Sequence, residues 1–206
     1  MNYKILKRFF DFLFAFFLII LLIPLFIIIG ILIKISSKGS IIYIQKRIGE
    51  NNTSFSCFKF RTMRPQSKYL LKKLLIKNLD YKNQFSETRK IINDPRVTKI
   101  GKFLRFSSLD ELPQIFNVFK GDMSFIGPRP IVKSEIKKYG KDFGKVFSIK
   151  PGISGLWQVS GRNNLSYDRR IELDIYYAEN INFLIDIKIF IKTIVVILFP
   201  FGKGAF

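Results

Sequence analysis

An apolar run near the N-terminus, from Phe12 to Ile33, constrains the fold more than any other feature of the sequence. Its 22 residues contain no charged side chain. As a helix rising about 1.5 Å per residue, the run matches the roughly 30 Å hydrocarbon core of a bilayer. It is longer than the apolar core of a usual cleavable signal, and the SSKGS that follows it shows no processing pattern. We therefore expect residues 1–38 to be a retained membrane anchor.

Pro24 lies in the middle of this run and predicts a kink, because proline removes a helical hydrogen bond and clashes with the preceding turn. Basic residues flank the run on both sides: Lys4, Lys7 and Arg8 before it, and Lys34, Lys38, Lys46 and Arg47 after it. Positive charge favours the cytoplasmic side, so both ends prefer the same side of the membrane. A re-entrant helix satisfies both flanks, and a bent spanning helix is the equally open alternative.

From Ser40 onward the composition is that of a soluble domain, and its charge and missing residue types narrow the chemistry. The net charge of +20 calls for anionic partners, which include nucleic acid, acidic lipid headgroups and phosphorylated substrates. With no His, imidazole bases, Ser-His-Asp systems and His-ligated metals are excluded. The single Cys57 excludes an intrachain disulfide and suits a cytoplasm-facing domain. Carboxylates must therefore carry any acid, base or nucleophilic role.

The segment from Ser40 to Met63 predicts two short strands joined by a turn between Gly49 and Thr53. In the second strand the alternation places Lys59 and Arg61 on one face and the phenylalanines on the other. Two cations would then project together from an apolar base. The alternative is a strand face that is merely solvated.

Two further segments have the character of membrane-surface helices. Residues Ser67 to Arg89 carry an apolar stripe among lysines, which suits a helix resting on anionic headgroups. They contain no nucleic-acid-binding motif, so we expect no nucleic-acid partner. The apolar segment Phe183 to Phe201 is interrupted by Asp186, Lys188 and Lys192, and spanning would bury those charges. We expect residues 183–206 to be interfacial and residues 39–182 to form the soluble domain.

Between these segments, Pro151 to Arg162 is a Gly-rich stretch with one tryptophan, and we expect a loop with strand character that lines a site. The alternative is a turn with a packed aromatic residue. A helix should follow, capped by Ser166. Its charged residues are interpreted as a solvated outer face: Arg169, Arg170, Glu172 and Asp174.

The adjacent acids Asp110 and Glu111 lie in the segment from Ser107 to Pro130, which reads SSLDELPQIFNVFKGDMSFIGPRP. Ser108 and Glu111 have the spacing of a capping box, so the pair could simply start a helix. The other interpretation is catalytic, because ionised carboxylates near Lys59, Arg61 and Arg105 would face whatever those cations bind. Local reasoning leaves both interpretations open.

Three long motifs resemble those of one family. KFRTM at 59–63, SLDELPQIFNVFKGDMSFIGPRP at 108–130 and KPGISGLWQVSGR at 150–162 are similar to the motifs of the bacterial sugar transferases, also called monotopic phosphoglycosyl transferases. They occur in the same order, and the likeness extends from the membrane segment to the GKGAF ending. It is greatest to the hexose-1-phosphate transferases that start exopolysaccharide and O-antigen repeat units, in a short form without a further membrane domain.

The resemblance implies an activity and a role for each matching residue. Members of the family transfer a sugar phosphate from a UDP-sugar to undecaprenyl phosphate and release UMP. Asp110 matches the nucleophile that forms a covalent phospho-sugar intermediate, and Glu111 matches its partner acid. Mg²⁺ would bridge this pair and the diphosphate. The positions that match those expected to hold phosphate oxygens are Lys59, Arg105 and Arg129, with Arg61 beside Lys59 on the strand. Arg162 is a candidate for the nucleotide side.

These inferences combine into one prediction. We expect a helix-dominated α/β domain with a small sheet, attached by a re-entrant N-terminal helix to the cytoplasmic face of a bacterial inner membrane rich in anionic lipid. We expect transfer of galactose or glucose 1-phosphate, with an N-acetylated sugar as the alternative and a homodimer as a possible assembly. The rival of a different class is a non-catalytic, membrane-tethered basic binding protein in which the acid pair only caps a helix.

Overall fold

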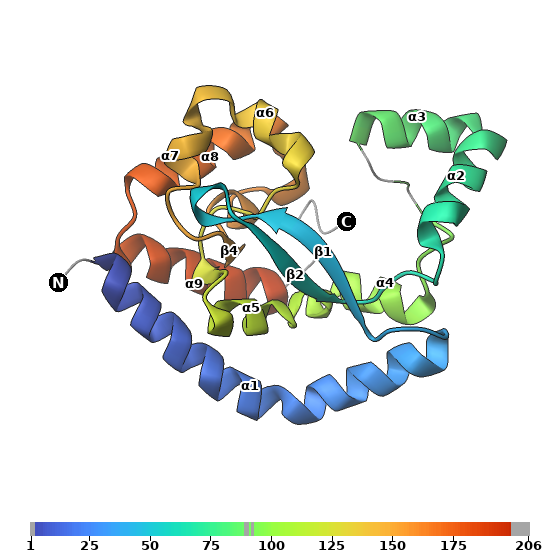
Figure 1. The fold of residues 1–206 in the computed structure, drawn as a ribbon, viewed down its shortest axis with the longest axis horizontal. Helices are drawn as coiled ribbons and strands as arrows, with labels where there is room; N and C mark the ends of the chain where they lie inside the picture. Colours follow the sequence, from blue (N-terminus) through green and yellow to red (C-terminus); the bar gives the residue numbers. More distant parts are fainter. Residues whose placement is uncertain (1–2, 89–90, 92, 199–206) are drawn as a thin grey trace.

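A computed structural model describes residues 3–88, 91 and 93–198 and has the predicted helix-dominated α/β composition, with two small sheets in place of one (Figure 1). The α-helices are α1 (Tyr3–Ser36), α2 (Ser67–Lys77), α3 (Leu79–Thr88), α4 (Lys99–Phe106), α5 (Gln114–Lys120), α6 (Ile136–Tyr139), α7 (Phe143–Val146), α8 (Tyr167–Glu179) and α9 (Phe183–Leu198). The strands are β1 (Ile42–Ile48), β2 (Ser54–Phe60), β3 (Ser124–Ile126) and β4 (Gly152–Ser154). Single 3₁₀ turns are η1 (Glu50–Asn52), η2 (Leu109–Glu111), η3 (Lys133–Glu135), η4 (Gly140–Asp142), η5 (Trp157–Val159) and η6 (Arg162–Asn164). The final residues of the predicted C-terminal segment, 199–206, lie outside the described residues.

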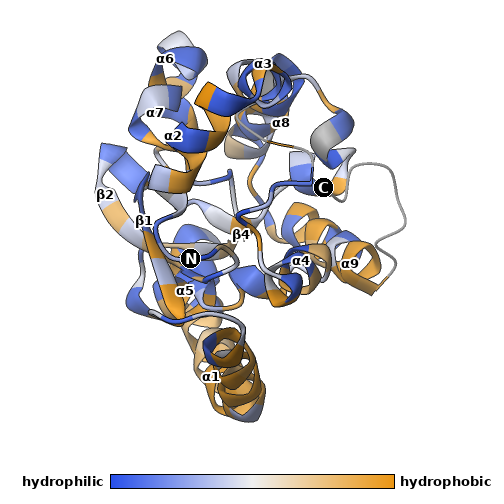
Figure 2. Ribbon diagram, turned by 90° about the vertical axis from the view of Figure 1, so that its right-hand side faces the viewer, coloured by the Kyte–Doolittle hydropathy of each residue, from blue (hydrophilic) through white to orange (hydrophobic). Residues whose placement is uncertain are grey.

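Helix α1 is bowed around one side of the domain, and Pro24 lies within it (Figure 1). Of the described helices it alone is long and apolar enough, by length and composition, to cross a membrane. Its inward face is buried at both halves: Asp11, Ala15, Ile29, Gly30 and Ile33. Its outward face leaves many large apolar side chains exposed. Figure 2 shows the apolar residues concentrated on α1 and α9. The more polar helices, among them α3, α6 and α7, lie at the opposite end of the domain from α1.

The N-terminal end of α1 is joined to α9 through Asp186. Tyr3 Oη donates to Asp186 Oδ2 at 2.6 Å, and Lys7 forms an ion pair with the same oxygen. Tyr177 Oη of α8 donates to Asp186 Oδ1 at 2.6 Å and lies 3.3 Å from the Ile126 carbonyl oxygen. Asp186 is therefore the buried centre of this network, whereas the sequence analysis had treated it only as a charge that disfavours a second membrane span.

The C-terminal end of α1 is joined to the domain by Arg61. Its guanidinium donates to the carbonyl oxygens of Ser37 and Lys38, each at 2.7 Å, immediately after the last turn of the helix. The predicted partnership of Arg61 and Lys59 on one strand face is not formed, because β2 ends at Phe60. Arg61 instead satisfies carbonyl groups left open at a helix end.

The hairpin predicted between Ser40 and Met63 is confirmed, with antiparallel strands β1 and β2 in a fixed register. Gln45 pairs with Cys57 and Arg47 pairs with Phe55. Directly opposed residues share a face of the sheet, so Arg47, Cys57 and Lys59 project to the same side. This side forms the floor of the site described below.

Asn117 of α5 joins this helix to the hairpin and has no exposed surface. Its Nδ2 donates to the Ser56 carbonyl oxygen at 2.7 Å, and its Oδ1 accepts from the Phe58 amide at 3.0 Å. The helix ends at Gly121, whose φ of 94° suits glycine and few other residues. Arg8 of α1 donates to the last carbonyl groups of α5, so the membrane helix also helps to place α5.

The strands β3 and β4 form a parallel pair of three residues each. β4 lies in the stretch for which strand character was expected, whereas β3 and the pairing were not predicted. At their contact a Cβ on Gly152 would lie 2.1 Å from the Gly127 amide nitrogen, so only glycine fits there. This close approach brings the segment before Arg129 against the Gly-rich stretch that begins at Pro151.

The basic segment predicted as one helix from Ser67 is two helices, α2 and α3, which project together from the rest of the domain (Figure 1). The break is at Asn78, which is extended and whose side-chain oxygen accepts the Tyr81 amide at 3.2 Å. A short polar side chain that caps a following helix explains the break. Arg89, the predicted end of the segment, lies outside the described residues.

Helix α8 is capped by Ser166 as predicted, but Asp174 is not on its solvated face. Asp174 is 1% exposed and accepts a hydrogen bond from Tyr139 Oη at 2.9 Å. Its other oxygen, Oδ1, is buried without a hydrogen-bond partner. Burial raises the pKa of Asp174 to about 7, so the folded protein favours the neutral carboxyl group.

Asp174→Asn should therefore stabilise the protein at high pH. Between the usual pKa near 3.8 and about 7, the unfolded chain loses the proton that the folded chain keeps, so the free energy of unfolding falls as pH rises. At about 1.4 kcal/mol per pKa unit, the substitution should add a few kcal/mol near pH 8 and almost nothing near pH 4. Thermal unfolding in detergent across this range measures the effect. The exposed Asp168→Asn is the control, and a gain that does not change with pH would contradict the explanation.

Candidate active site

The acids Asp110 and Glu111 lie in a single 3₁₀ turn, η2, between α4 and α5. Helix α4 is capped by Thr98, whose hydroxyl accepts the Gly101 amide at 2.9 Å. Ser108 is left-handed, with φ 57°, and its side chain makes no capping hydrogen bond. The capping-box interpretation is therefore wrong: α5 starts at Gln114, after Glu111 and Pro113. Capping does not explain why two acids are adjacent here.

Glu111 forms an ion pair with Lys59 across the gap between η2 and the hairpin. The Glu111 side chain is 33% exposed and that of Lys59 is 21% exposed. Burial alone would raise the pKa of Glu111, but Lys59, with Arg129 and Arg47 farther away, holds it below its usual range. Glu111 is therefore ionised at neutral pH.

Asp110 is in a different environment. Burial raises the pKa of Asp110 to about 6, and the charge of Glu111 adds to this effect, while Lys59 and Arg105 oppose it. Arg105 is held in place by Thr62, to whose hydroxyl its Nε donates at 3.0 Å. Asp110 is thus a carboxylate poorly stabilised by its surroundings and close to cations, a state suited to a nucleophile.

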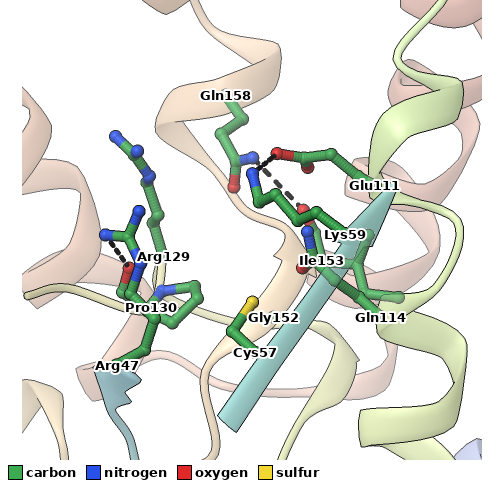
Figure 3. A pocket seen from close by; sticks show the side chains of 10 residues that line it. All are labelled: Arg47, Cys57, Lys59, Glu111, Gln114, Arg129, Pro130, Gly152, Ile153 and Gln158. Carbon is green, nitrogen blue, oxygen red and sulfur yellow. Dashed lines mark hydrogen bonds and ion pairs between the residues drawn. The ribbon is translucent and has the colours of Figure 1, made fainter. Parts of the chain in front are cut away.

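Beside this pair is a small pocket between η2, the hairpin and the segment around Arg129 (Figure 3). Its lining holds the cations Arg47, Lys59 and Arg129 and a single carboxylate, Glu111. Its volume of about 20 Å³ is close to that of one water molecule, so a larger ligand requires side chains to move. Such an excess of partly buried positive charge favours an anion such as phosphate.

A family profile described as "Bacterial sugar transferase" matches residues 2–200. The chain belongs to the bacterial sugar transferase family.

Three relatives illustrate its range. The chain is 45% identical over 190 residues to "Exopolysaccharide production protein ExoY" of Rhizobium meliloti, covering 91% of this chain and 83% of the relative. It is 43% identical over 195 residues to "Undecaprenyl-phosphate galactose phosphotransferase" of Salmonella typhimurium, covering 95% and 41%. It is 37% identical over 206 residues to "UDP-N-acetylgalactosamine-undecaprenyl-phosphate N-acetylgalactosaminephosphotransferase" of Aeromonas hydrophila, covering 97% and 45%. The chain therefore spans less than half of the two longer relatives.

In this sugar transferase the structure brings most of the predicted residues together. Lys59, Glu111 and Arg129 line the pocket, and Arg105 lies near Asp110. Arg162 begins η6, where its Nε donates to the Gln158 carbonyl oxygen at 3.3 Å, close behind the pocket wall. Arg61 is bound at the end of α1 and does not join the cluster.

The Gly-rich stretch lines the site as expected, through Gly152, Ile153 and Gln158. Trp157 is buried, and two guanidinium groups lie over its ring, with Arg129 at 5.9 Å and Arg170 at 5.0 Å from the ring centroid. Sequence reasoning missed Gln114, Gln158 and Arg47 as lining residues. A strand register pairing Gln45 with Cys57 would have identified Arg47, because it then shares a face with Lys59.

The acid pair also bears on the predicted Mg²⁺. Among the described residues there is no group of three or more His, Cys, Asp or Glu side chains that could hold a metal ion. Asp110 and Glu111 offer hard oxygen ligands, and Mg²⁺ usually completes its coordination with water and substrate phosphate. The donor set fits a metal held jointly with a phosphorylated substrate.

Proposed function

We propose that this sugar transferase moves hexose 1-phosphate from a UDP-sugar to undecaprenyl phosphate and releases UMP, as a first step in building an exopolysaccharide, O-antigen or capsule repeat unit. The observation that supports this most is the pocket with three cations and one carboxylate next to Asp110. The names of the relatives supply the donor and the acceptor. The rival, a non-catalytic basic binding protein, gives no reason for a destabilised carboxylate beside that pocket.

In the first half-reaction Asp110 attacks the sugar-bearing phosphorus. The bond between that phosphorus and the oxygen of the nucleotide phosphate breaks, UMP leaves, and an aspartyl phospho-sugar forms. Lys59 and Arg105 lie near Asp110 and stabilise charge on the transferring phosphoryl oxygens. Arg129 holds phosphate oxygens of the donor, and Arg162 contacts its nucleotide side.

In the second half-reaction a phosphate oxygen of undecaprenyl phosphate attacks the same phosphorus. The aspartyl bond breaks, Asp110 regains its carboxylate, and the lipid diphosphate sugar is released. Two half-reactions let a soluble donor and a lipid acceptor use one small site in turn.

Asp110 and Glu111 would hold Mg²⁺ together with the donor phosphates. When bound, the ion supplies charge neutralisation and Lewis acidity at the diphosphate. Lys59 keeps Glu111 ionised and therefore ready to act as a ligand.

We infer galactose or glucose as the sugar, and an N-acetylated sugar is the alternative that the Aeromonas relative represents. A panel of UDP-sugars tests the proposal: UMP release that requires undecaprenyl phosphate for full turnover and stops with EDTA is expected for one hexose donor. No UMP release from any UDP-sugar in the presence of Mg²⁺ would refute the function.

We further propose that α1 is re-entrant and that the domain lies on the cytoplasmic side. Both ends of α1 are bound to the same domain, at Asp186 and at Arg61, and its inward face is buried along both halves. This attachment at both ends supports a helix whose two ends stay on the same side of the bilayer as the domain. The exposed apolar side chains of α9 would contact the same leaflet. A homodimer stays a prediction.

Cysteine labelling tests this topology. Lys4→Cys and Lys38→Cys, each in a Cys57→Ser background, place one thiol near either end of α1 at exposed positions. In intact cells a membrane-impermeant maleimide should label neither thiol, and both should react after the cells are opened. Labelling of exactly one position in intact cells would show that α1 spans the membrane.

A further inference from the structure

Arg47 is a lining residue of the pocket without a role in the reaction described above. Its side chain is 10% exposed, and its guanidinium donates to the Pro130 carbonyl oxygen at 3.2 Å and to Gln45 Oε1 at 2.9 Å. Burial lowers the pKa of Arg47, and the charge of Arg129 lowers it further. Two guanidinium groups are thus held near each other in a partly buried place.

The acids around these two arginines are largely committed to other groups. Glu135 Oε2 is 3.8 Å from Arg47 and accepts the Val132 amide at 2.9 Å. Glu111 is paired with Lys59. Among the described residues no carboxylate lies within 4 Å of Arg129, whose guanidinium rests on Trp157. Buried cations without sufficient acids are unfavourable alone and become favourable when an anion binds.

The pocket has two cationic ends. In Figure 3, Lys59 and Glu111 lie at one side and Arg47 and Arg129 at the other, with Cys57 between them. Asp110 adjoins the Lys59 end. A diphosphate that presents its sugar-bearing phosphorus to Asp110 would direct its second phosphate toward the two arginines.

We propose that Arg47 acts with Arg129 as a clamp for the nucleotide phosphate that leaves as UMP. This inference rests on the proposed function and adds a binding residue to it. The planar guanidinium forks suit bidentate contact with phosphate oxygens. The backbone contact at Pro130 also links the two arginines, since Arg47 holds the residue that follows Arg129.

Binding of UMP to full-length protein in detergent tests the clamp, with Asp110→Asn as the parent so that no chemistry occurs. Adding Arg47→Gln should weaken UMP binding about 10- to 100-fold, and Arg47→Lys, which keeps the charge but loses the fork, should give a smaller loss. Arg169→Gln removes an exposed arginine paired with Glu172 and should leave UMP affinity unchanged.

A second measurement separates binding from a structural role. With Asp110 intact, Arg47→Lys should raise the inhibition constant for UMP yet leave transfer from the preformed covalent intermediate to undecaprenyl phosphate within about twofold of wild type. Unchanged UMP affinity in both Arg47 variants overturns the clamp, as does equal slowing of both half-reactions. If Arg47→Gln does not fold, the UMP affinity of Arg47→Lys alone tests the clamp. Failure of the wild type to release UMP would instead refute the proposed function.

Discussion

Asp110→Asn is expected to reduce UMP release from the UDP-sugar by about a thousandfold or more, because an amide is not able to attack phosphorus in place of the carboxylate. The shape of the side chain is kept, and Asp110 has no ion pair in the described part of the chain, so the fold should survive. Single-turnover release of UMP without lipid acceptor measures the loss directly.

The matched control is Asp168→Asn, an exposed acid on α8 that should keep full activity. Mass spectrometry of the protein incubated with donor alone should detect a phospho-sugar adduct on the peptide containing Asp110 in the wild type and none in the variant. Full activity of Asp110→Asn, or an adduct on Glu111, would show that the nucleophile is assigned incorrectly.

Asp186→Asn should cause the largest loss of stability. The substitution removes the ion-pair partner of Lys7, whose side chain is 12% exposed, and it replaces one of the two carboxylate oxygens that accept from Tyr3 and Tyr177 with an amide nitrogen. Breaking a buried pair from one side costs about 3–5 kcal/mol, or roughly 10 °C in the unfolding temperature of a domain of this size. Thermal unfolding in detergent micelles measures the shift.

Two comparisons check the cause. Lys192→Gln, at an exposed position of α9, should leave the unfolding temperature almost unchanged. Lys7→Met combined with Asp186→Asn removes the unpaired charge, keeps a side-chain oxygen at position 186 and should recover part of the lost stability. A double variant that is as unstable as Asp186→Asn would mean that the lost hydrogen bonds, and not the unpaired charge, govern this position.

The parts of the fold predictable from sequence depended on short-range signals. Strand alternation identified the hairpin, and the single hydroxyl of Ser166 marked the start of α8. Strand alternation made Lys59 a candidate partner of the acid pair, but it does not predict the contact with Glu111, which joins positions 52 residues apart. The adjacency of the two acids was visible, but not the 3₁₀ turn that holds them.

The errors came from contacts across the chain. Nothing local indicates that Asp174 is buried under Tyr139, or that Asp186 meets residues from the first turns of α1. Arg61 lies one residue beyond the end of β2, so the strand alternation does not fix the direction of its side chain. Its guanidinium instead donates to carbonyl oxygens at the end of α1. The residue pattern of one helix or strand does not show which other element packs against it. Charged residues at contacts between two elements are therefore predicted to be solvent-exposed when they are not.

The attachment of α1 at both ends also bears on how the protein is made. Ala15 packs in the same hydrophobic cluster as Phe55, Cys57 and Met123, and further along the helix Ile29 and Ile33 pack with Phe60 and Leu104, so the core is incomplete without the membrane segment. The domain therefore completes its hydrophobic core only when α1 is in place beside it. A fragment that lacks α1 would expose Phe55, Phe60 and Leu104 and should aggregate instead of folding by itself.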